Sequence, residues 1–268
     1  MASDIHTTAI LGKNVELGEN VTIRPYAVIE DNVKIGNGCS IGASALIGSH
    51  TTIGDGTTIF NGASVGTIPQ DLKYRGEETT LTIGKNTIIR EFCTINRGTI
   101  EKGTTVIGDN CALLAYCHVA HDCILGNNVV ISNSLSMAGH VIVGDFVVIG
   151  GDTAIHQFCR IGSYSMVGAR SYITKDVVPY SLCAKGEAGA ERIVGINKVG
   201  LERRGFDEDR RRRIKNSYKT LFRSDLTVKE AVARLESTVL GDQDILFLLD
   251  FIKASTRGLY NMDSALEE

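Results

Sequence analysis

Apolar residues recur at every sixth position through the first two thirds of this chain. Of the 29 positions taken at that interval from Ile5 to Ile173, 26 are Ile, Leu, Val or Met, and only Asp71, Glu77 and Glu101 are not. A period of six fits neither the 3.6-residue turn of a helix nor the simple alternation of an open strand, but it is typical of short strands wound into a parallel β-helix. The repeat therefore predicts a triangular prism with three hexads in each coil.

The same repeat explains an unusual composition. The 268 residues include no Trp and only 6% aromatic residues, because aliphatic side chains stacked from coil to coil would fill the prism without large rings. Residues 5–178 would make about ten coils of about 18 residues. Six of the seven cysteines lie four places after a repeat position, where we expect small inward-facing thiols and no disulfide framework: Cys39, Cys93, Cys111, Cys117, Cys123 and Cys159.

Two parts of the chain depart from the repeat. The polar segment TIPQDLKYRGEE holds two of the three exceptions, so we expect residues 67–80 to form a loop extruded from the prism. Beyond Pro179 the hexads stop, and apolar residues then recur at helical spacing. The predicted organisation is an all-β parallel β-helix over residues 1–185 followed by a small α-helical C-terminal domain over residues 186–268.

Within this second domain we predict three helices. Asp207 and Thr227 are favourable N-caps for the first two, and DILFLLDFIKAS has a strong apolar stripe for the third. The run Arg210–Arg213 argues little for nucleic acid, because a helix spreads four successive residues around its circumference and acidic residues precede them.

Charge and hydropathy exclude several classes of protein. A net charge of −3 argues against recruitment by bulk charge. The chain opens without a positively charged and apolar leader, and no run of about 18 apolar residues could span a membrane. We therefore expect a soluble, cytoplasmic protein.

Four of the six histidines are grouped between residues 118 and 156. Because residues 18 apart stack directly in adjacent coils, Asp122 should lie under His140 and His121 under Gly139. One face of the prism would then gather imidazoles, a carboxylate and an amide over three coils, from these residues: His118, His121, Asp122, Gly139, His140, His156 and Gln157.

This cluster has the parts of an acyl-transfer site. His121 could act as a general base, Asp122 could orient it, and the backbone amide of Gly139 could stabilise an oxyanion. A zinc-dependent hydratase like the gamma-class carbonic anhydrases, which hold zinc with three histidines from two chains, is the alternative that spacing leaves open. A purely structural β-helix is a third, but it would not need a polar cluster.

Five motifs on this framework, IPQDLKY, AYCHVAHDC, MAGHVIVGDFVVIGG, AIHQFCRIG and NKVGLERRGF, closely resemble the acyl-[acyl-carrier-protein]:UDP-N-acetylglucosamine O-acyltransferases of lipid A biosynthesis. The resemblance covers essentially the whole chain. It implies a left-handed β-helix and a homotrimer with active sites between neighbouring prisms. It also implies transfer of a 3-hydroxyacyl chain from acyl carrier protein to the glucosamine 3-position, without a cofactor beyond the phosphopantetheine of the carrier.

The resemblance assigns roles to individual residues. His121 would be the base, with Asp122 and Gly139 as already described, and Ala169 would measure the acyl chain. Sugar and acyl amide would be held by Gln70, Asp71, Lys73, His118, His140, His156 and Gln157. The nucleotide phosphates would lie near Asn197, Arg203 and Arg204, and basic faces after Arg210 would dock the carrier protein.

Two positions depart from the family pattern. Asn96 stands where the family often has a His, and Val199 stands where a Glu is common. These departures leave open whether the acceptor group is a 3-hydroxyl or the 3-amine of a diamino-sugar analogue.

Overall fold

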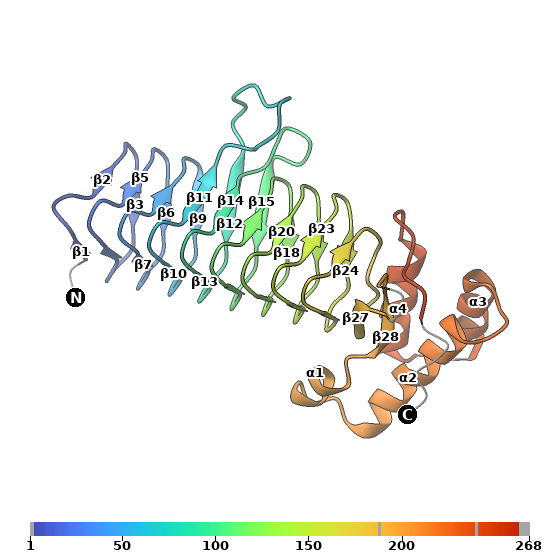
Figure 1. Ribbon diagram of the computed structural model, residues 1–268. Coiled ribbons are helices and arrows are strands. Elements are labelled where there is room, and N and C mark those ends of the chain that lie inside the picture. Colours follow the sequence, from blue (N-terminus) through green and yellow to red (C-terminus); the bar gives the residue numbers. More distant parts are fainter. Residues whose placement is uncertain (1–2, 187–188, 239–240, 263–268) are drawn as a thin grey trace.

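The computed structural model describes residues 3–186, 189–238 and 241–262 and shows a left-handed parallel β-helix capped by helices (Figure 1). Three sheets, here called A, B and C in the order in which each coil visits them, form the sides of the prism. Their strands are parallel except at the end of sheet A, where the last strand pairs antiparallel with the one before it. Neighbouring strands in a sheet pair at the same repeat position, as in Val119 with Met137 and Met137 with Ile155. The predicted 18-residue coil is confirmed by this register.

Most strands are only two residues long because a turn follows each apolar residue of the repeat. Sheet A contains β1 (Asp4–Ile5), β4 (Thr22–Ile23), β7 (Ser40–Ile41), β10 (Thr58–Ile59), β13 (Ile88–Ile89), β16 (Ala112–Leu113), β19 (Val130–Ile131), β22 (Val148–Ile149), β25 (Met166–Val167), β27 (Ser181–Lys185) and β28 (Glu191–Ile196). Sheet B contains β2 (Ile10–Leu11), β5 (Val28–Ile29), β8 (Leu46–Ile47), β11 (Ser64–Thr67), β14 (Thr94–Asn96), β17 (His118–Val119), β20 (Ser136–Met137), β23 (Ala154–Ile155) and β26 (Tyr172–Ile173). Sheet C contains β3 (Glu16–Leu17), β6 (Lys34–Ile35), β9 (Thr51–Ile53), β12 (Thr80–Ile83), β15 (Thr104–Ile107), β18 (Ile124–Leu125), β21 (Ile142–Val143) and β24 (Arg160–Ile161).

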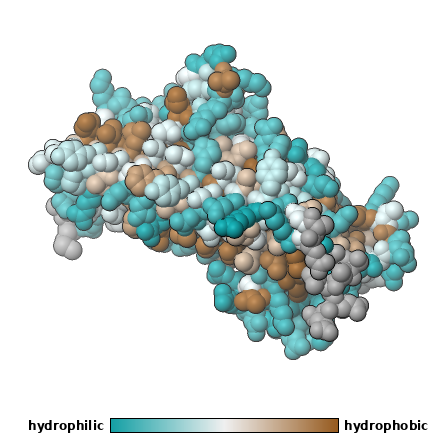
Figure 2. All heavy atoms as spheres, viewed as in Figure 1, coloured by the Kyte–Doolittle hydropathy of each residue, from teal (hydrophilic) through white to brown (hydrophobic). Residues whose placement is uncertain are grey.

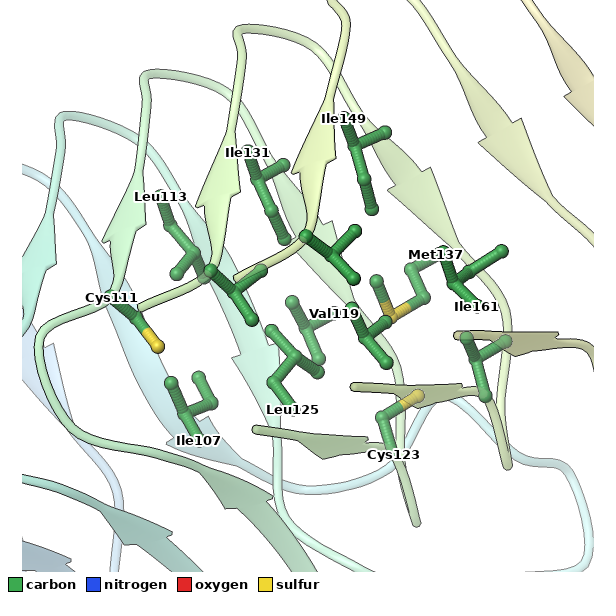
Figure 3. Close-up of a cluster of buried hydrophobic side chains, with 14 of the residues drawn as sticks. Ile107, Cys111, Leu113, Val119, Cys123, Leu125, Ile131, Met137, Ile149 and Ile161 are labelled. Carbon is green, nitrogen blue, oxygen red and sulfur yellow. The ribbon is translucent and has the colours of Figure 1, made fainter. Parts of the chain in front are cut away.

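Aliphatic side chains and thiols fill the prism. Figure 3 shows Leu113, Ile131 and Ile149 from sheet A facing Leu125 from sheet C across the interior, with Cys111 and Cys123 among them. These residues are all at most 1% exposed. The six predicted inward cysteines are confirmed as buried free thiols, and Cys183 is a seventh. Coil-to-coil stacking of medium-sized apolar groups therefore provides the core in place of large rings.

The expectation of about ten coils is wrong. The strands β1 to β25 of sheet A make nine, because two insertions take up the rest of the repeat. Thr58 pairs with Ile88, 30 residues on, and Thr82 pairs with Val106, 24 residues on, instead of 18. The first insertion is the segment 68–79 between β11 and β12, and the second is the segment 97–103 between β14 and β15. Their added lengths are multiples of six, so the sixth-position count runs through both without a break.

The three predicted C-terminal helices are confirmed. Asp207 caps α2 (Glu208–Phe222) through a bond from Arg210 N, and Asp242 caps α4 (Gln243–Lys253). Thr227 and Glu230 bond each other's backbone N–H groups at the start of α3 (Val228–Thr238), as in a capping box. A short helix α1 (Lys198–Arg203) that we did not predict precedes them.

The four successive arginines of α2 are all paired with acidic side chains. Arg210 forms a bidentate pair with Asp244 at 2.5 and 2.8 Å, and Arg213 pairs with Asp242 at 2.7 Å. Arg211 and Arg212 pair with Glu202 and Asp209. The pairs with Asp242 and Asp244 fasten α2 to the start of α4, which explains the charge run without nucleic acid. No helix in the described segments has the length and apolarity needed to cross a bilayer.

Candidate active site

Both insertions and the predicted histidine cluster lie along one corner of the prism, the turns that join sheet B to sheet C, here called the B–C corner. In successive coils this corner carries the segment 68–79, the segment 97–103, His121–Asp122, Gly139–His140 and Gln157–Phe158. The backbone confirms the stacking, because His140 N donates to His121 O and Phe158 N donates to Gly139 O. Residues that are 18 apart in the sequence thus form one continuous surface beside two loops.

At the centre of this surface His121 and Asp122 form a hydrogen-bonded pair. His121 Nδ1 lies 2.8 Å from Asp122 Oδ2, and the Asp122 side chain is fully buried. Thr99 of the second insertion donates to the same carboxylate twice, from its N to Oδ1 at 2.9 Å and from Oγ1 to Oδ2 at 2.6 Å. The carboxylate is therefore held by three donors.

The charges of the pair follow from these contacts. Burial acts to raise the pKa of Asp122, but hydrogen bonds from Thr99 and His121 outweigh it, and the pKa lies below its ordinary value. An ionised carboxylate only accepts hydrogen bonds, so Nδ1 of His121 carries the proton that it donates. In the neutral ring Nε2 is then left with its lone pair free to accept a proton, which is the arrangement that a general base needs.

A second imidazole lies next to the pair. The ring of His140 stacks on Phe158 at 4.6 Å and meets the ring of His121 edge-on at 5.2 Å. Its Nε2 lies 3.3 Å from Glu101 Oε2 and 3.7 Å from Asp122 Oδ2. Burial lowers the pKa of His140 against the opposing influence of the two carboxylates, which favours a neutral ring near pH 7.

Gly139 packs against the face of His121. A Cβ atom at this glycine would lie 2.7 Å from Cε1 and 2.9 Å from Nε2 of His121, closer than carbon atoms tolerate. Within the described segments the amide of Gly139 has no hydrogen-bond acceptor, whereas the corresponding amides of Asp109 and Asn127 donate to Asn or Asp side chains one coil further on. Gly139 therefore offers a free N–H donor directly beside the imidazole.

The other predicted residues of this face have individual partners. His118 Nδ1 lies 2.8 Å from Thr94 Oγ1, and burial, with a smaller contribution from His121, lowers the pKa of His118. His156 Nδ1 lies 3.2 Å from the guanidinium of Arg257 and 3.1 Å from the carbonyl oxygen of its neighbour Gln157. The Gln157 side chain is exposed at the corner.

The segment 68–79 carries Gln70, Asp71 and Lys73 and has internal structure. Asp71 Oδ1 accepts from Lys73 N at 2.9 Å, while Gln70 and Lys73 are exposed. Buried Asn96, the residue that departs from the family pattern, ties down the start of this segment by donating to Ile68 O at 2.8 Å. Asn96 therefore has a structural role at the base of the loop.

The remaining predicted residues lie at other corners. Asn197 is the N-cap of α1 and also donates to Tyr164 O at 2.9 Å, and the guanidinium of Arg204 lies 4.7 Å from the ring centre of Phe146. Phe146 and Tyr164 belong to the turns between sheets C and A, and the side chain of Arg203, the residue before Arg204, is exposed. Ala169 is exposed in a turn between sheets A and B. A single chain therefore does not bring Asn197, Arg203 and Arg204 together with His121.

One group of side chains has metal-ligand chemistry. His121, Asp122 and His140 each place one ligand atom within 4.8 Å of the others. These ligand atoms are already engaged in hydrogen bonds, however. The Asp122 carboxylate accepts three, and one of them comes from Nδ1 of His121. The geometry therefore fits a hydrogen-bonded base better than a three-histidine zinc site.

Comparison with known proteins identifies the family. Residues 176–260 match the family model described as "Udp N-acetylglucosamine O-acyltransferase; Domain 2", and residues 14–49, 26–61 and 104–134 match the bacterial transferase hexapeptide repeat. The acyl-[acyl-carrier-protein]–UDP-N-acetylglucosamine O-acyltransferase of Trichlorobacter lovleyi is 48% identical over 95% of this chain and 98% of its own. The chain belongs to this acyltransferase family.

Further members of the acyltransferase family are similar to this chain in sequence and in structure. The acyl-[acyl-carrier-protein]–UDP-N-acetylglucosamine O-acyltransferase of a Sulfurihydrogenibium species is 50% identical over 96% of this chain and 94% of its own. The UDP-N-acetylglucosamine acyltransferase structure from Francisella novicida superposes with a TM-score of 0.93 at 33% identity, covering 97% of this chain and 95% of that one. The Campylobacter jejuni structure gives 0.90 at 41% identity, covering 96% and 99%. The carbonic anhydrase alternative has no support from these comparisons.

Sequence reasoning missed two residues of the site. Thr99 and Glu101 both come from the second insertion, which we did not expect. A signal was present, because Glu101 is the one exception to the sixth-position repeat outside the predicted loop. A polar residue at a core position marks a segment that has left the prism.

Gly139→Ala tests the close approach of the imidazole. The backbone of Gly139 does not have a positive φ, so Ala brings only its Cβ, and His121 must rotate away from Asp122 to accept it. We expect turnover to fall by much of the roughly 10²–10⁴-fold that a general base contributes. Gly195→Ala is the control, because its Cβ would meet nothing within 4 Å. Unchanged turnover for Gly139→Ala at unchanged melting temperature would contradict the packing argument.

Proposed function

We propose that this chain transfers a 3-hydroxyacyl group from acyl carrier protein to the glucosamine 3-position of UDP-N-acetylglucosamine, or to the 3-amine of its diamino analogue, in lipid A biosynthesis. The observation that carries the proposal is the His121–Asp122 pair beside the free amide of Gly139. Family membership supplies the substrates, since the relatives are named for acyl carrier protein and UDP-N-acetylglucosamine.

The chemistry follows from the proton positions. Nε2 of His121 takes the proton of the acceptor group as its oxygen or nitrogen attacks the thioester carbonyl. The Gly139 amide donates to the oxyanion that forms, and ionised Asp122 stabilises the imidazolium. When the carbon–sulfur bond breaks, the imidazolium returns its proton to the leaving phosphopantetheine thiolate. In this scheme sugar and acyl amide are held by Gln70, Asp71, Lys73, His118, His140, His156 and Gln157.

A direct assay tests this function. Hydroxyacyl carrier protein is offered with UDP-N-acetylglucosamine or with its 3-amino analogue, and the metal content of the same sample is measured. We expect transfer to at least one acceptor, and the preferred one identifies the nucleophile. Stoichiometric zinc without acyl transfer would overturn the proposal.

His121→Ala tests the base. Removing the imidazole should lower kcat by roughly 10²–10⁴-fold, the factor that a general base contributes. Asp122→Asn should be milder, since it disturbs the orientation of the ring but leaves the base present. Thermal melting serves as the control for folding, and wild-type turnover in His121→Ala would refute the assignment.

We infer that the active form is a homotrimer in which two chains complete each site. Asn197, Arg203 and Arg204 lie at a different corner from His121, so a neighbouring prism would have to bring them to it. The extruded loop also exposes apolar residues, seen as brown spheres in Figure 2, including Leu72 with 96% of its surface exposed. Such side chains suit a contact with another chain.

Mixed trimers test the shared site. His121→Ala and Arg204→Ala should each be poorly active alone, whereas co-assembled chains should regain about a quarter of the sites, because random mixing pairs an intact His121 with an intact Arg204 at that frequency. Sedimentation verifies the assembly. An active monomer, or mixed trimers without recovery, would contradict the inference.

The carrier protein would dock on the helical domain. The arginines of α2 are occupied by ion pairs, but Lys215 and Lys219 of the same helix have none among the described residues and line a pocket of about 550 Å³ with Lys198. Unpaired lysines suit an acidic partner.

A cytoplasmic location fits the seven free thiols, which a reducing compartment preserves.

Ala169 is proposed as the residue that measures the acyl chain. Its methyl group is exposed in a turn between sheets A and B, where it would meet the end of a chain lying along the prism. Ala169→Gly should move the preferred hydroxyacyl length longer and Ala169→Met should move it shorter, with modest discrimination because one buried methylene contributes about 0.8 kcal/mol. Values of kcat/KM over a ladder of hydroxyacyl carrier proteins measure this. A preferred length that ignores both changes would remove Ala169 from the mechanism.

A further inference from the structure

The second insertion is fastened to the prism on both sides of Thr99. Before Thr99, Arg97 N donates to Thr67 O at 3.0 Å and Gly98 N donates to Thr80 O at 3.1 Å. After it, Gly103 O accepts from Thr80 N at 2.9 Å. Thr99 itself is only 5% exposed. Its side chain therefore occupies a defined place against Asp122.

The proton of the Thr99 hydroxyl is also assigned by its neighbours. Glu101 N lies 3.3 Å from Thr99 Oγ1 and can only donate, so Oγ1 accepts there. The hydroxyl hydrogen is then directed to Asp122 Oδ2, 2.6 Å away. Because Thr99 N binds Oδ1, the two donors of Thr99 fix the rotation of the carboxylate.

This rotation decides which imidazole the carboxylate serves. Oδ2 of Asp122 lies 2.8 Å from Nδ1 of His121 but 3.7 Å from Nε2 of His140, so a small turn of the carboxylate would let it engage His140 instead. Glu101 opposes that change, because its Oε2 lies closer to His140 Nε2, at 3.3 Å. Each imidazole thus has its own carboxylate: Asp122 of the regular turn for His121, and Glu101 of the insertion for His140.

We propose that Thr99 and Glu101 are positioning residues of the transfer reaction: Thr99 holds Asp122 toward His121, and Glu101 engages His140 so that Asp122 serves His121 alone. The proposal rests on the proposed function, because it takes His121 to be the base. It also gives the second insertion a role in the chemistry, acting through Asp122 without touching the substrate.

The test compares Thr99→Val with Thr105→Val. Both replace a buried threonine whose hydroxyl bonds to Asp122, but Thr105 Oγ1 accepts from Asp122 N at 2.8 Å and leaves the carboxylate untouched. We expect Thr99→Val to lower kcat by about ten- to a hundredfold, by analogy with the range found for outer partners that orient metal-binding histidines. Thr99→Ser, which keeps the hydroxyl, should restore most of the rate, and Thr105→Val should lower the melting temperature with a much smaller effect on kcat.

A double-mutant cycle separates positioning from general destabilisation. In the Asp122→Asn background, Thr99→Val should cause less than about a twofold further loss, because its effect passes through that carboxylate. Glu101 is exposed, with 59% of its side chain accessible, so Glu101→Gln keeps the test available even if Thr99→Val fails to fold. Glu101→Gln should lower kcat severalfold in the wild-type background, and it should not lower kcat further in the Asp122→Asn background.

The outcomes distinguish the two proposals. Equal loss of kcat in Thr99→Val and Thr105→Val, or full additivity of Thr99→Val and Glu101→Gln with Asp122→Asn, would overturn the positioning role while the transfer activity stands. A wild-type protein that transfers no acyl group to either acceptor would instead overturn the proposed function.

Discussion

Hydrogen bonding between identical positions of successive coils is the constraint on which the rest of this molecule depends. Each strand is too short to be stable alone, and it exists because the coils before and after it supply its hydrogen-bond partners and cover its apolar side chain. The ladder allows no slip, since a shift of one residue would turn Ile, Leu and Val outward. A residue is therefore placed in space by its position in the repeat.

The same constraint builds the site. Turns at the B–C corner stack as strictly as the strands do, so His121, Gly139 and Gln157 form a column and Asp122, His140 and Phe158 form another. In the regular turns of this corner the second residue has positive φ, 60° at Asp122 and 62° at His140. This conformation keeps these side chains beside one another at the corner. Rigid turns thus hold the proposed base and its carboxylate in place without a large supporting domain.

Insertions at this corner add what the repeat cannot. A regular turn offers one side chain per position. The segment 97–103 leaves the prism and folds back so that Thr99 donates two hydrogen bonds to the fully buried carboxylate of Asp122. Burial alone would favour the protonated form of Asp122, and the hydrogen bonds from Thr99 and His121 reverse that preference. The loops interrupt the repeat, but their lengths preserve its register, so the coils beyond them continue unchanged.

The sequence by itself determined the prism, the inward thiols, the helix caps at Asp207 and Thr227 and the stacking of His121 under Gly139, because each depends on local chemistry or on a fixed count along the chain. It also indicated the pairing of His121 with Asp122, since both lie in one turn. The tertiary structure alone decided that Thr99 and Glu101 join the site, that Asn96 anchors the first loop, and that nine coils are present instead of ten. Those features depend on where an insertion folds after it leaves the ladder, and no period in the sequence encodes that path. They also depend on contacts between coils, which exist only once the prism has closed.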